Sequence, residues 1–190
     1  MVFFTSDLHF NHDKEFIWKA RGFSSVEDMN RGLIDNWNSV VCPNDEVYVL
    51  GDFILGDDLQ KAEEILNSLN GHIYLIIGNH DTRAKRSFYD RFDKVHKPFY
   101  ARRKVFVDGK VLLLQHYPPE SVTGRIWTLY GHIHVTKAYT DTMSWQYNVA
   151  VDAHNNTPVS AETLIKELND IEKTYCFKNF EEREIYYVKR

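Results

Sequence analysis

The sequence predicts an α/β protein in which mixed β-sheets lie inside and helices lie outside. Short apolar runs bounded by turn residues indicate buried strands. Helical patterns separate the early runs, whereas the second half is richer in strands and hairpins. At 190 residues, without an internal repeat, low-complexity tract or Pro/Ser-rich linker, we expect a single domain over residues 1–190.

The first half alternates strands and helices in chain order. The expected strands are Val2–Thr5, Val47–Leu50 and Ile73–Ile77. Apolar residues recur at near-helical spacing between them, which predicts helices over Asp28–Val41 and Asp58–Leu69. Strand–helix alternation of this kind indicates βαβ units, whose continuous apolar strands are covered on both faces.

The second half contains four further predicted strands and one helix. Asp108-Gly109 lies between two of these strands and predicts a tight hairpin. An acidic helix is expected after a Ser160 N-cap. The strands are Val105–Val107, Val111–Leu114, Ile126–Tyr130 and Tyr147–Val151, and the helix is Ala161–Glu172.

The composition excludes several classes of protein. Hydrophobic residues make up 43% and charged residues 26%, which argues against disorder. No apolar run reaches the length of a membrane span, and the start lacks the basic region and cleavage site of a signal peptide. Cys42 and Cys176 form neither a metal-type pair nor a disulfide framework. We therefore expect a cytoplasmic protein with no membrane association, and no protein partner is evident.

The charge is unevenly distributed. The net charge is −4, yet residues 83–104 contain nine Lys or Arg and two Asp, a net charge of +7. Such a run is usually a solvated face. If part of this basic stretch folds back toward an active site, it would favour a nucleotide or short oligonucleotide, since Arg suits bidentate phosphate contacts.

Asp, Asn or His residues follow five of the predicted strands. Because sites in open α/β sheets assemble beyond the carboxyl ends of strands, these groups can converge at one edge. Glycine precedes three of them, at Gly51, Gly78 and Gly131, and permits a sharp turn and close backbone approach. The groups are Asp7 and His9; Asp52; Asn79, His80 and Asp81; His116; and His132 and His134.

Seven of these groups are potential metal ligands, more than a single ion needs. They suit two ions if Asp52, at a central strand, bridges them. The donors are N and O without thiolate, which favours two divalent transition-metal ions among Mn, Fe, Zn, Co and Ni, with Mn preferred. A lone histidine is more often structural, and that remains the expectation for the four other histidines, His12, His72, His96 and His154.

The ordered motifs Asp7-Leu8-His9, Gly51-Asp52, Gly78-Asn79-His80-Asp81, Gln115-His116 and Gly131-His132-Ile133-His134 resemble the calcineurin-like metallophosphoesterase superfamily, in its small phage-like and bacterial branch. The resemblance implies a four-layer αββα sandwich of mixed sheets flanked by helices. It also implies two metal sites. Asp7, His9 and His134 would hold one ion, Asn79, His116 and His132 would hold the other, and Asp52 would bridge them.

The same resemblance implies catalytic roles for His80 and Asp81. His80 would stand over the substrate phosphate and stabilise charge or protonate the leaving oxygen. Asp81 would orient His80, although it could instead be the N-cap of a helix that begins at Thr82.

Departures from the family pattern concern the substrate side. The protein phosphatases of the superfamily carry G-D-x-x-D-R-G, and the missing arginine argues against a protein substrate. Arg21, in Ala20-Arg21-Gly22-Phe23, resembles the family's Arg-Pro-Phe. The substrate-side candidates are Asn11, His12, Arg21 and Arg83.

Together, these expectations predict a dinuclear phosphoesterase that uses a metal-bridging hydroxide. Its substrates would be phosphate esters, with phosphodiesters, as in a nucleotide or short oligonucleotide, preferred over monoesters. The alternatives are a phosphomonoesterase or nucleotide phosphatase, and a non-catalytic binding module that retains the fold. The aromatic-rich segment from Thr174 to Arg190 is either a packed terminal element or an interface.

Overall fold

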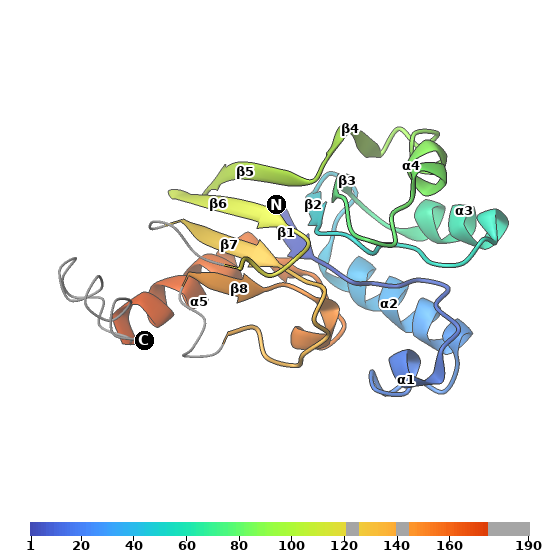
Figure 1. The fold of residues 1–190 in the computed structure, drawn as a ribbon, viewed down its shortest axis with the longest axis horizontal. Coiled ribbons are helices and arrows are strands. Elements are labelled where there is room, and N and C mark those ends of the chain that lie inside the picture. The colour runs from blue at the N-terminus through green and yellow to red at the C-terminus, as the bar shows by residue number, and fades with distance from the viewer. Residues whose placement is uncertain (121–125, 140–144, 175–190) are drawn as a thin grey trace.

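The computed structural model describes residues 1–120, 126–139 and 145–174, and it contains two β-sheets (Figure 1). The first sheet has five strands in the order β4-β3-β2-β1-β9. Strands β1 to β4 are parallel, and β9 pairs with β1 in the antiparallel direction. These strands are β1 Val2–Thr5, β2 Glu46–Val49, β3 His72–Ile76, β4 Val95–Tyr100 and β9 Val159–Ser160.

The second sheet has four strands in the order β5-β6-β7-β8. Strands β6, β7 and β8 are parallel, whereas β5 and β6 form an antiparallel hairpin. Asp108 and Gly109 connect the hairpin with φ angles of 46° and 81°, as a two-residue turn between twisted strands requires. These strands are β5 Arg102–Val107, β6 Lys110–Gln115, β7 Trp127–Tyr130 and β8 Gln146–Asn148.

Side chains cap the helices that cover the sheets. Ser25, Asp58 and Thr82 each accept a hydrogen bond from a backbone N–H in the first turn of α2, α3 and α4, which stabilises their N-termini. The helices are α1 Glu15–Trp18, α2 Val26–Val40, α3 Leu59–Ser68, α4 Arg83–Tyr89, the short 3₁₀ helix η1 Val151–Ala153, and α5 Ala161–Thr174.

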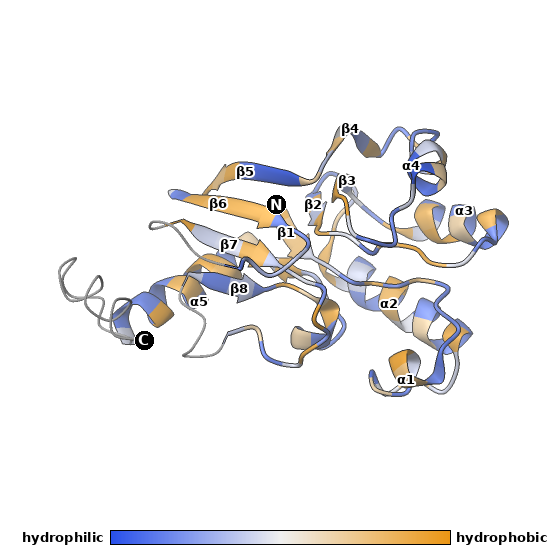
Figure 2. Cartoon of the chain, viewed as in Figure 1, coloured by the Kyte–Doolittle hydropathy of each residue, from blue (hydrophilic) through white to orange (hydrophobic). Residues whose placement is uncertain are grey.

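Two apolar cores hold these layers together. The first lies between α2 to α4 and one face of the first sheet, with Trp37 fully buried at its centre. The second contains apolar side chains from both sheets and from α5, including Phe4, Leu114 and Leu168. In Figure 2 the apolar colouring is clearest on β6, whereas β8 is largely hydrophilic. The predicted fold of two mixed sheets flanked by helices is therefore confirmed.

The sequence-based prediction lacks helix α1, the 3₁₀ helix η1 and strands β4 and β9, and it contains α4 only as an alternative to a catalytic role of Asp81. Helix α1 and strand β9 are too short to produce a clear hydrophobic period. In β4, the residues His96, Lys97 and Pro98 interrupt the apolar pattern that would indicate a strand. The two alternatives for the terminal segment concern residues beyond 174, outside the described part of the chain.

Membrane spanning can be judged for the helices in the described ranges. None of them combines the length and the hydropathy that a membrane span requires.

Candidate metal centre

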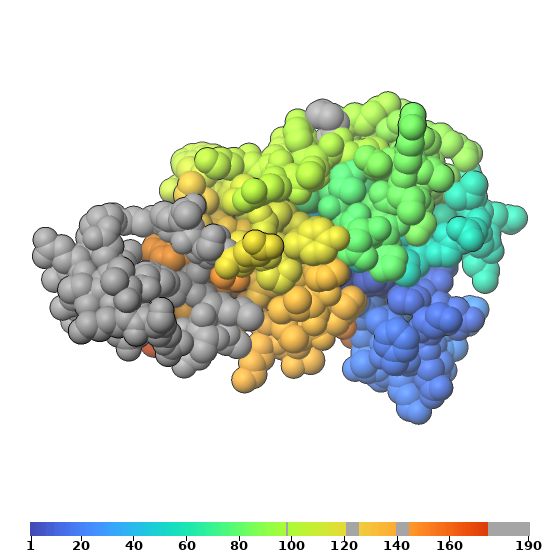
Figure 3. Space-filling model, in the orientation of Figure 1, coloured from blue at the N-terminus to red at the C-terminus, as the bar shows by residue number. Residues whose placement is uncertain are grey.

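The polar residues that follow the strands of both sheets meet at one edge. Pairing between β1 and β2 continues beyond the strand ends, where the N–H groups of Asp7 and His9 donate to the carbonyls of Gly51 and Asp52, each over 3.0 Å. The N–H of His132 donates to Asp7 Oδ2 over 2.7 Å and links the two sheets. In Figure 3 the blue, green, yellow and orange segments that follow β1, β3, β6 and β7 gather on one face.

The first ligand group consists of Asp7, His9 and His134. One potential ligand atom from each lies within 4.8 Å of the others. Asp7 Oδ1 is 3.7 Å from His9 Nε2 and 3.8 Å from His134 Nε2. Asp7 Oδ1 and His9 Nε2 are buried and have no hydrogen-bond partner among the described residues. Buried polar atoms are normally paired, so these two fit a bound cation.

The second ligand group consists of Asp52, His116 and His132, again with ligand atoms within 4.8 Å of one another. His116 Nε2 lies 3.5 Å from Asp52 Oδ2 and 3.2 Å from His132 Nδ1. Asn79 Oδ1 is 2.9 Å from the same Nε2 and so adds an amide oxygen to the group. The other nitrogen, His116 Nδ1, contacts the Leu50 carbonyl at 2.8 Å, which directs Nε2 toward the group.

Asp52 lies between the two ligand groups. Its Oδ2 atom is 3.6 Å from His9 Nε2 and 3.5 Å from His116 Nε2. Its Oδ1 atom accepts a hydrogen bond from the backbone N–H of His80 over 2.8 Å. One carboxylate oxygen therefore faces a histidine of each group, the placement expected of a bridging ligand.

The backbone around these ligands is tightly packed and strained. A Cβ atom on Gly78 would lie 2.3 Å from Asp52 Oδ1, and one on Gly131 would lie 2.1 Å from Asp7 Oδ2. Five of the seven ligand residues have φ angles in the left-handed region, between 45° and 74°, namely Asp7, His9, Asp52, His132 and His134. Non-glycine residues adopt this region rarely, and such strain clusters at functional sites.

The donor set fits divalent transition metals. Nitrogen and oxygen donors without thiolate favour such ions over Ca or Mg. Burial lowers the pKa of both His9 and His132, which keeps these imidazoles in the neutral form that binds a metal.

His80 lies exposed beside the first ligand group. Its ring centroid is 5.6 Å from that of His9, and its backbone N–H is held by Asp52. The side chain can therefore reach a substrate without belonging to either ligand group.

Asp81 is buried and holds the backbone rather than the His80 imidazole. Its Oδ2 accepts hydrogen bonds from the N–H groups of Gly78 and Asp52 over 2.9 and 2.8 Å, and Tyr89 Oη lies 3.5 Å from Oδ1. Burial raises the pKa of Asp81. The alternative of a helix cap is wrong, because Thr82 is the N-cap of α4. The expectation that Asp81 orients the His80 ring is corrected: the carboxylate fixes the two loops that carry Asn79 and Asp52.

Asn11 and His12 follow the first ligand group along the chain. Asn11 has a φ angle of 64° and exchanges two hydrogen bonds with Asn30, over 3.0 and 2.7 Å, so it shapes the loop. The His12 ring lies 5.2 Å from that of His9, and burial lowers its pKa to about 4. His12 is thus placed beside the site.

The remaining histidines have contacts away from the ligands. His72 and His96 contact each other at 3.1 Å, and His154 contacts the Asn148 carbonyl at 2.9 Å. These contacts agree with structural roles.

Arg21 does not face the substrate, which corrects the expectation for this residue. Its side chain is 1% exposed. The guanidinium donates to the carbonyls of Asp7 and Leu8 over 2.6 and 2.8 Å and pairs with Asp152. It therefore lies beneath the metal centre as a buried, fully engaged cation.

Sequence reasoning missed Asp152 and Tyr117. Asp152 Oδ2 lies 3.0 Å from His134 Nδ1. The Tyr117 ring is half-exposed and lies 4.7 and 5.0 Å from the rings of His132 and His116. Asp152 follows a predicted strand and Tyr117 follows a predicted ligand, so the signal that found the other residues could have found both.

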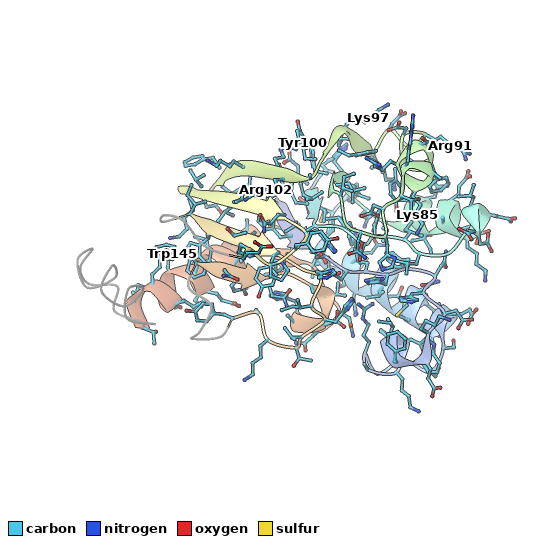
Figure 4. The ribbon with its side chains drawn as sticks, viewed as in Figure 1. Lys85, Arg91, Lys97, Tyr100, Arg102 and Trp145 are labelled. Atoms are coloured by element: carbon cyan, nitrogen blue, oxygen red, sulfur yellow. The ribbon has the colours of Figure 1, made fainter. Side chains whose placement is uncertain are left out.

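Three cations of the basic stretch of residues 83–104 have contacts outside the ligand groups. Arg91 pairs with Glu63 and Lys97 with Asp90, and both extend toward the periphery in Figure 4. Arg103 lies over three tyrosine rings at 5.1 to 5.4 Å, those of Tyr48, Tyr74 and Tyr100.

Two members of this stretch bear on the substrate expectation. Lys85 is half-buried, and burial lowers its pKa. Arg83 is exposed at the first position of α4. Arg83 therefore faces solvent, whereas Lys85 is only partly accessible.

Comparisons with known proteins agree with this geometry. The family described as Calcineurin-like phosphoesterase matches residues 1–182. The chain is 36% identical over 172 residues to the uncharacterized protein MJ1445 of Methanocaldococcus jannaschii, covering 87% of this chain and 89% of that protein. It is also 29% identical to the Gene 66 protein of Mycobacterium phage D29, covering 90% and 98% of the two chains.

Among solved structures, the protein of unknown function AQ665 from Aquifex aeolicus superimposes with a TM-score of 0.65 and 26% identity, covering 88% of this chain and 98% of that one. The matched region includes every proposed metal ligand, from Asp7 to His134. The chain belongs to the calcineurin-like phosphoesterase family.

Proposed function

We propose that this protein is a dinuclear metal-dependent phosphoesterase that prefers phosphodiesters, as in a nucleotide or short oligonucleotide. The observation that carries the proposal is the position of Asp52, with one oxygen 3.6 and 3.5 Å from histidines of the two ligand groups. A single metal site would need only one of these groups. The proposal includes one catalytic domain over residues 1–190 and Mn as the preferred ion.

The proposed roles divide between metal binding and proton transfer. Asp7, His9 and His134 would hold one ion, and Asn79, His116 and His132 the other, with Asp52 shared. Two such ions would supply Lewis-acid stabilisation of the phosphoryl group and activate water. His80 is free to donate a proton to the leaving oxygen, because its ring is exposed and its backbone alone is anchored. Asp81 acts as a positioning residue for the loops beneath it.

The diester preference rests on the charges near the centre. A monoester carries a second negative charge that an arginine clamp would stabilise. Arg21, the arginine expected nearest the substrate, is instead buried and paired with Asp152. A diester, with one negative charge, places less demand on the site.

The nucleotide preference rests on Tyr117 and Lys85. The half-exposed Tyr117 ring beside His132 offers a face on which a base can stack. Lys85, half-buried on α4, would supply a cation for the phosphate. His12 and Arg83 are the remaining candidates for substrate contact, together with Asn11 acting through its loop.

The test is turnover of an aryl phosphodiester and an aryl phosphomonoester after loading with Mn, Fe, Zn, Co or Ni in turn. We expect two bound ions per chain by metal analysis and a higher kcat/KM for the diester. His96→Ala is the control, because His96 contacts His72 outside the centre.

Each other result selects an alternative. A higher kcat/KM for the monoester would favour a phosphomonoesterase or nucleotide phosphatase. Two bound ions without turnover of either ester would favour the non-catalytic binding module. Fewer than two bound ions in every preparation would contradict the dinuclear centre.

A further inference from the structure

Beneath the first ligand group lies a buried ion pair that the proposed reaction does not use. Arg21 and Asp152 are 131 positions apart in the sequence and form two parallel hydrogen bonds of 3.0 Å each, from Nε to Oδ1 and from Nη2 to Oδ2. Their side chains are 1% and 12% exposed. Bidentate pairs of this kind have defined geometry as well as charge, so they hold both partners in fixed orientations.

The pair contacts two of the three residues in the first ligand group. Asp152 Oδ2 lies 3.0 Å from His134 Nδ1, while His134 Nε2 faces Asp7 Oδ1 at 3.8 Å. Arg21 donates to the Asp7 carbonyl over 2.6 Å. An imidazole that binds a metal through Nε2 carries its proton on Nδ1, and an acceptor there fixes both the tautomer and the ring.

We propose that Asp152, held by Arg21, is a positioning residue that directs His134 Nε2 toward Asp7 and so sets the metal affinity of the first ligand group. The inference rests on the proposed metal centre. The expected effect on metal affinity is limited to the first group. In the second group the corresponding contact comes from a backbone carbonyl, that of Leu50 on His116 Nδ1. Removal of Asp152 therefore affects one group and leaves the other intact.

The experiment is a calorimetric Mn²⁺ titration of the metal-free full-length chain. Wild-type protein should show two binding steps, and Asp7→Ala identifies the step of the first ligand group by abolishing it. Asp152→Ala should weaken that step by about 10- to 100-fold, the usual effect of removing such a partner, and leave the other step unchanged. Asp152→Asn, which keeps the shape and one acceptor oxygen, should give a smaller loss and serves if the alanine variant does not fold.

The matched control is Asp45→Asn, which alters a buried carboxylate outside the centre that accepts from the Cys42 N–H over 2.7 Å. It should leave both steps unchanged whatever its effect on thermal unfolding. Unchanged affinities in Asp152→Ala, or equal weakening of both steps, would overturn the inference while the dinuclear centre stands. If wild-type protein binds none of Mn, Fe, Zn, Co and Ni, the proposed function fails and this inference fails with it.

Discussion

The two ligand groups are held in different ways. In the first group, charged side chains from distant segments, Arg21 and Asp152, position His134 and the Asp7 backbone. In the second group, the Leu50 carbonyl at the end of β2 positions His116. The first group contains buried atoms without partners among the described residues, whereas the His116 nitrogens of the second group have close neighbours.

This difference means that substitutions can affect the ligand positions of the two groups to different extents. A ligand held by a side-chain network can be altered by a substitution far from the ion, whereas a ligand held by a strand backbone changes only with the sheet. We therefore expect the affinities of the two groups to be separable by mutation everywhere except at Asp52.

The largest expected effect comes from Asp52, because it is common to both groups. Asp52→Asn should lower the affinity of both steps together and reduce kcat by on the order of 10⁴-fold or more, the scale seen when a central group of an active site is removed. Metal analysis and aryl-phosphodiester turnover measure the two effects. If the Asp52→Asn variant bound one ion with the wild-type affinity, Asp52 would not be shared by the two groups.

A smaller effect, confined to catalysis, is expected of His80→Ala. The His80 backbone N–H that contacts Asp52 survives the substitution, so both ions should remain bound. Loss of the proton donor should lower kcat by about 10²- to 10⁴-fold. Loss of an ion on this substitution would place His80 among the ligands.

Two glycines allow the shared Asp52 and the first ligand group to be strained separately. A Cβ atom on Gly78 meets Asp52 Oδ1, and one on Gly131 meets Asp7 Oδ2. Each change to Ala should cost about 1–3 kcal/mol in the free energy of unfolding, measured by urea denaturation. We expect Gly131→Ala to weaken the first group more than the second.

Gly109→Ala is the control for these two variants. Gly109 has a φ of 81° with open space around its Cβ position, so the substitution adds backbone strain without contacting a ligand. If it weakened metal binding as Gly131→Ala does, the close contact with Asp7 would not be the cause.

The smallest effect is expected of Arg103→Leu. The guanidinium lies over three tyrosine rings outside both groups, so its loss should cost about 0.5–2 kcal/mol in the free energy of unfolding. Both metal affinities and kcat/KM should stay the same. A tenfold fall in kcat/KM would instead assign Arg103 to the substrate surface.

Much of this centre could be predicted because its signals are local. The ligands follow apolar runs, in three cases after a glycine that ends the run. Parallel strands place their carboxyl ends at the same edge of the sheet. The roles of Arg21 and Asp81 were predicted incorrectly because a motif records which residues are adjacent in sequence, not which side chains are buried. Strand β4 was missed because its polar residues hide the strand period.

The sequence by itself determined strands β1 to β3 and β5 to β8, helices α2, α3 and α5, the identity of the seven ligand candidates and the position of His80 after a strand. Tertiary structure decided that Asp81 holds backbone, that Arg21 lies under the site, and that Asp152 contacts His134. The physical reason is distance along the chain: strand ends are specified by local hydrophobic patterns, whereas a pairing across 131 positions forms only when packing brings both partners together.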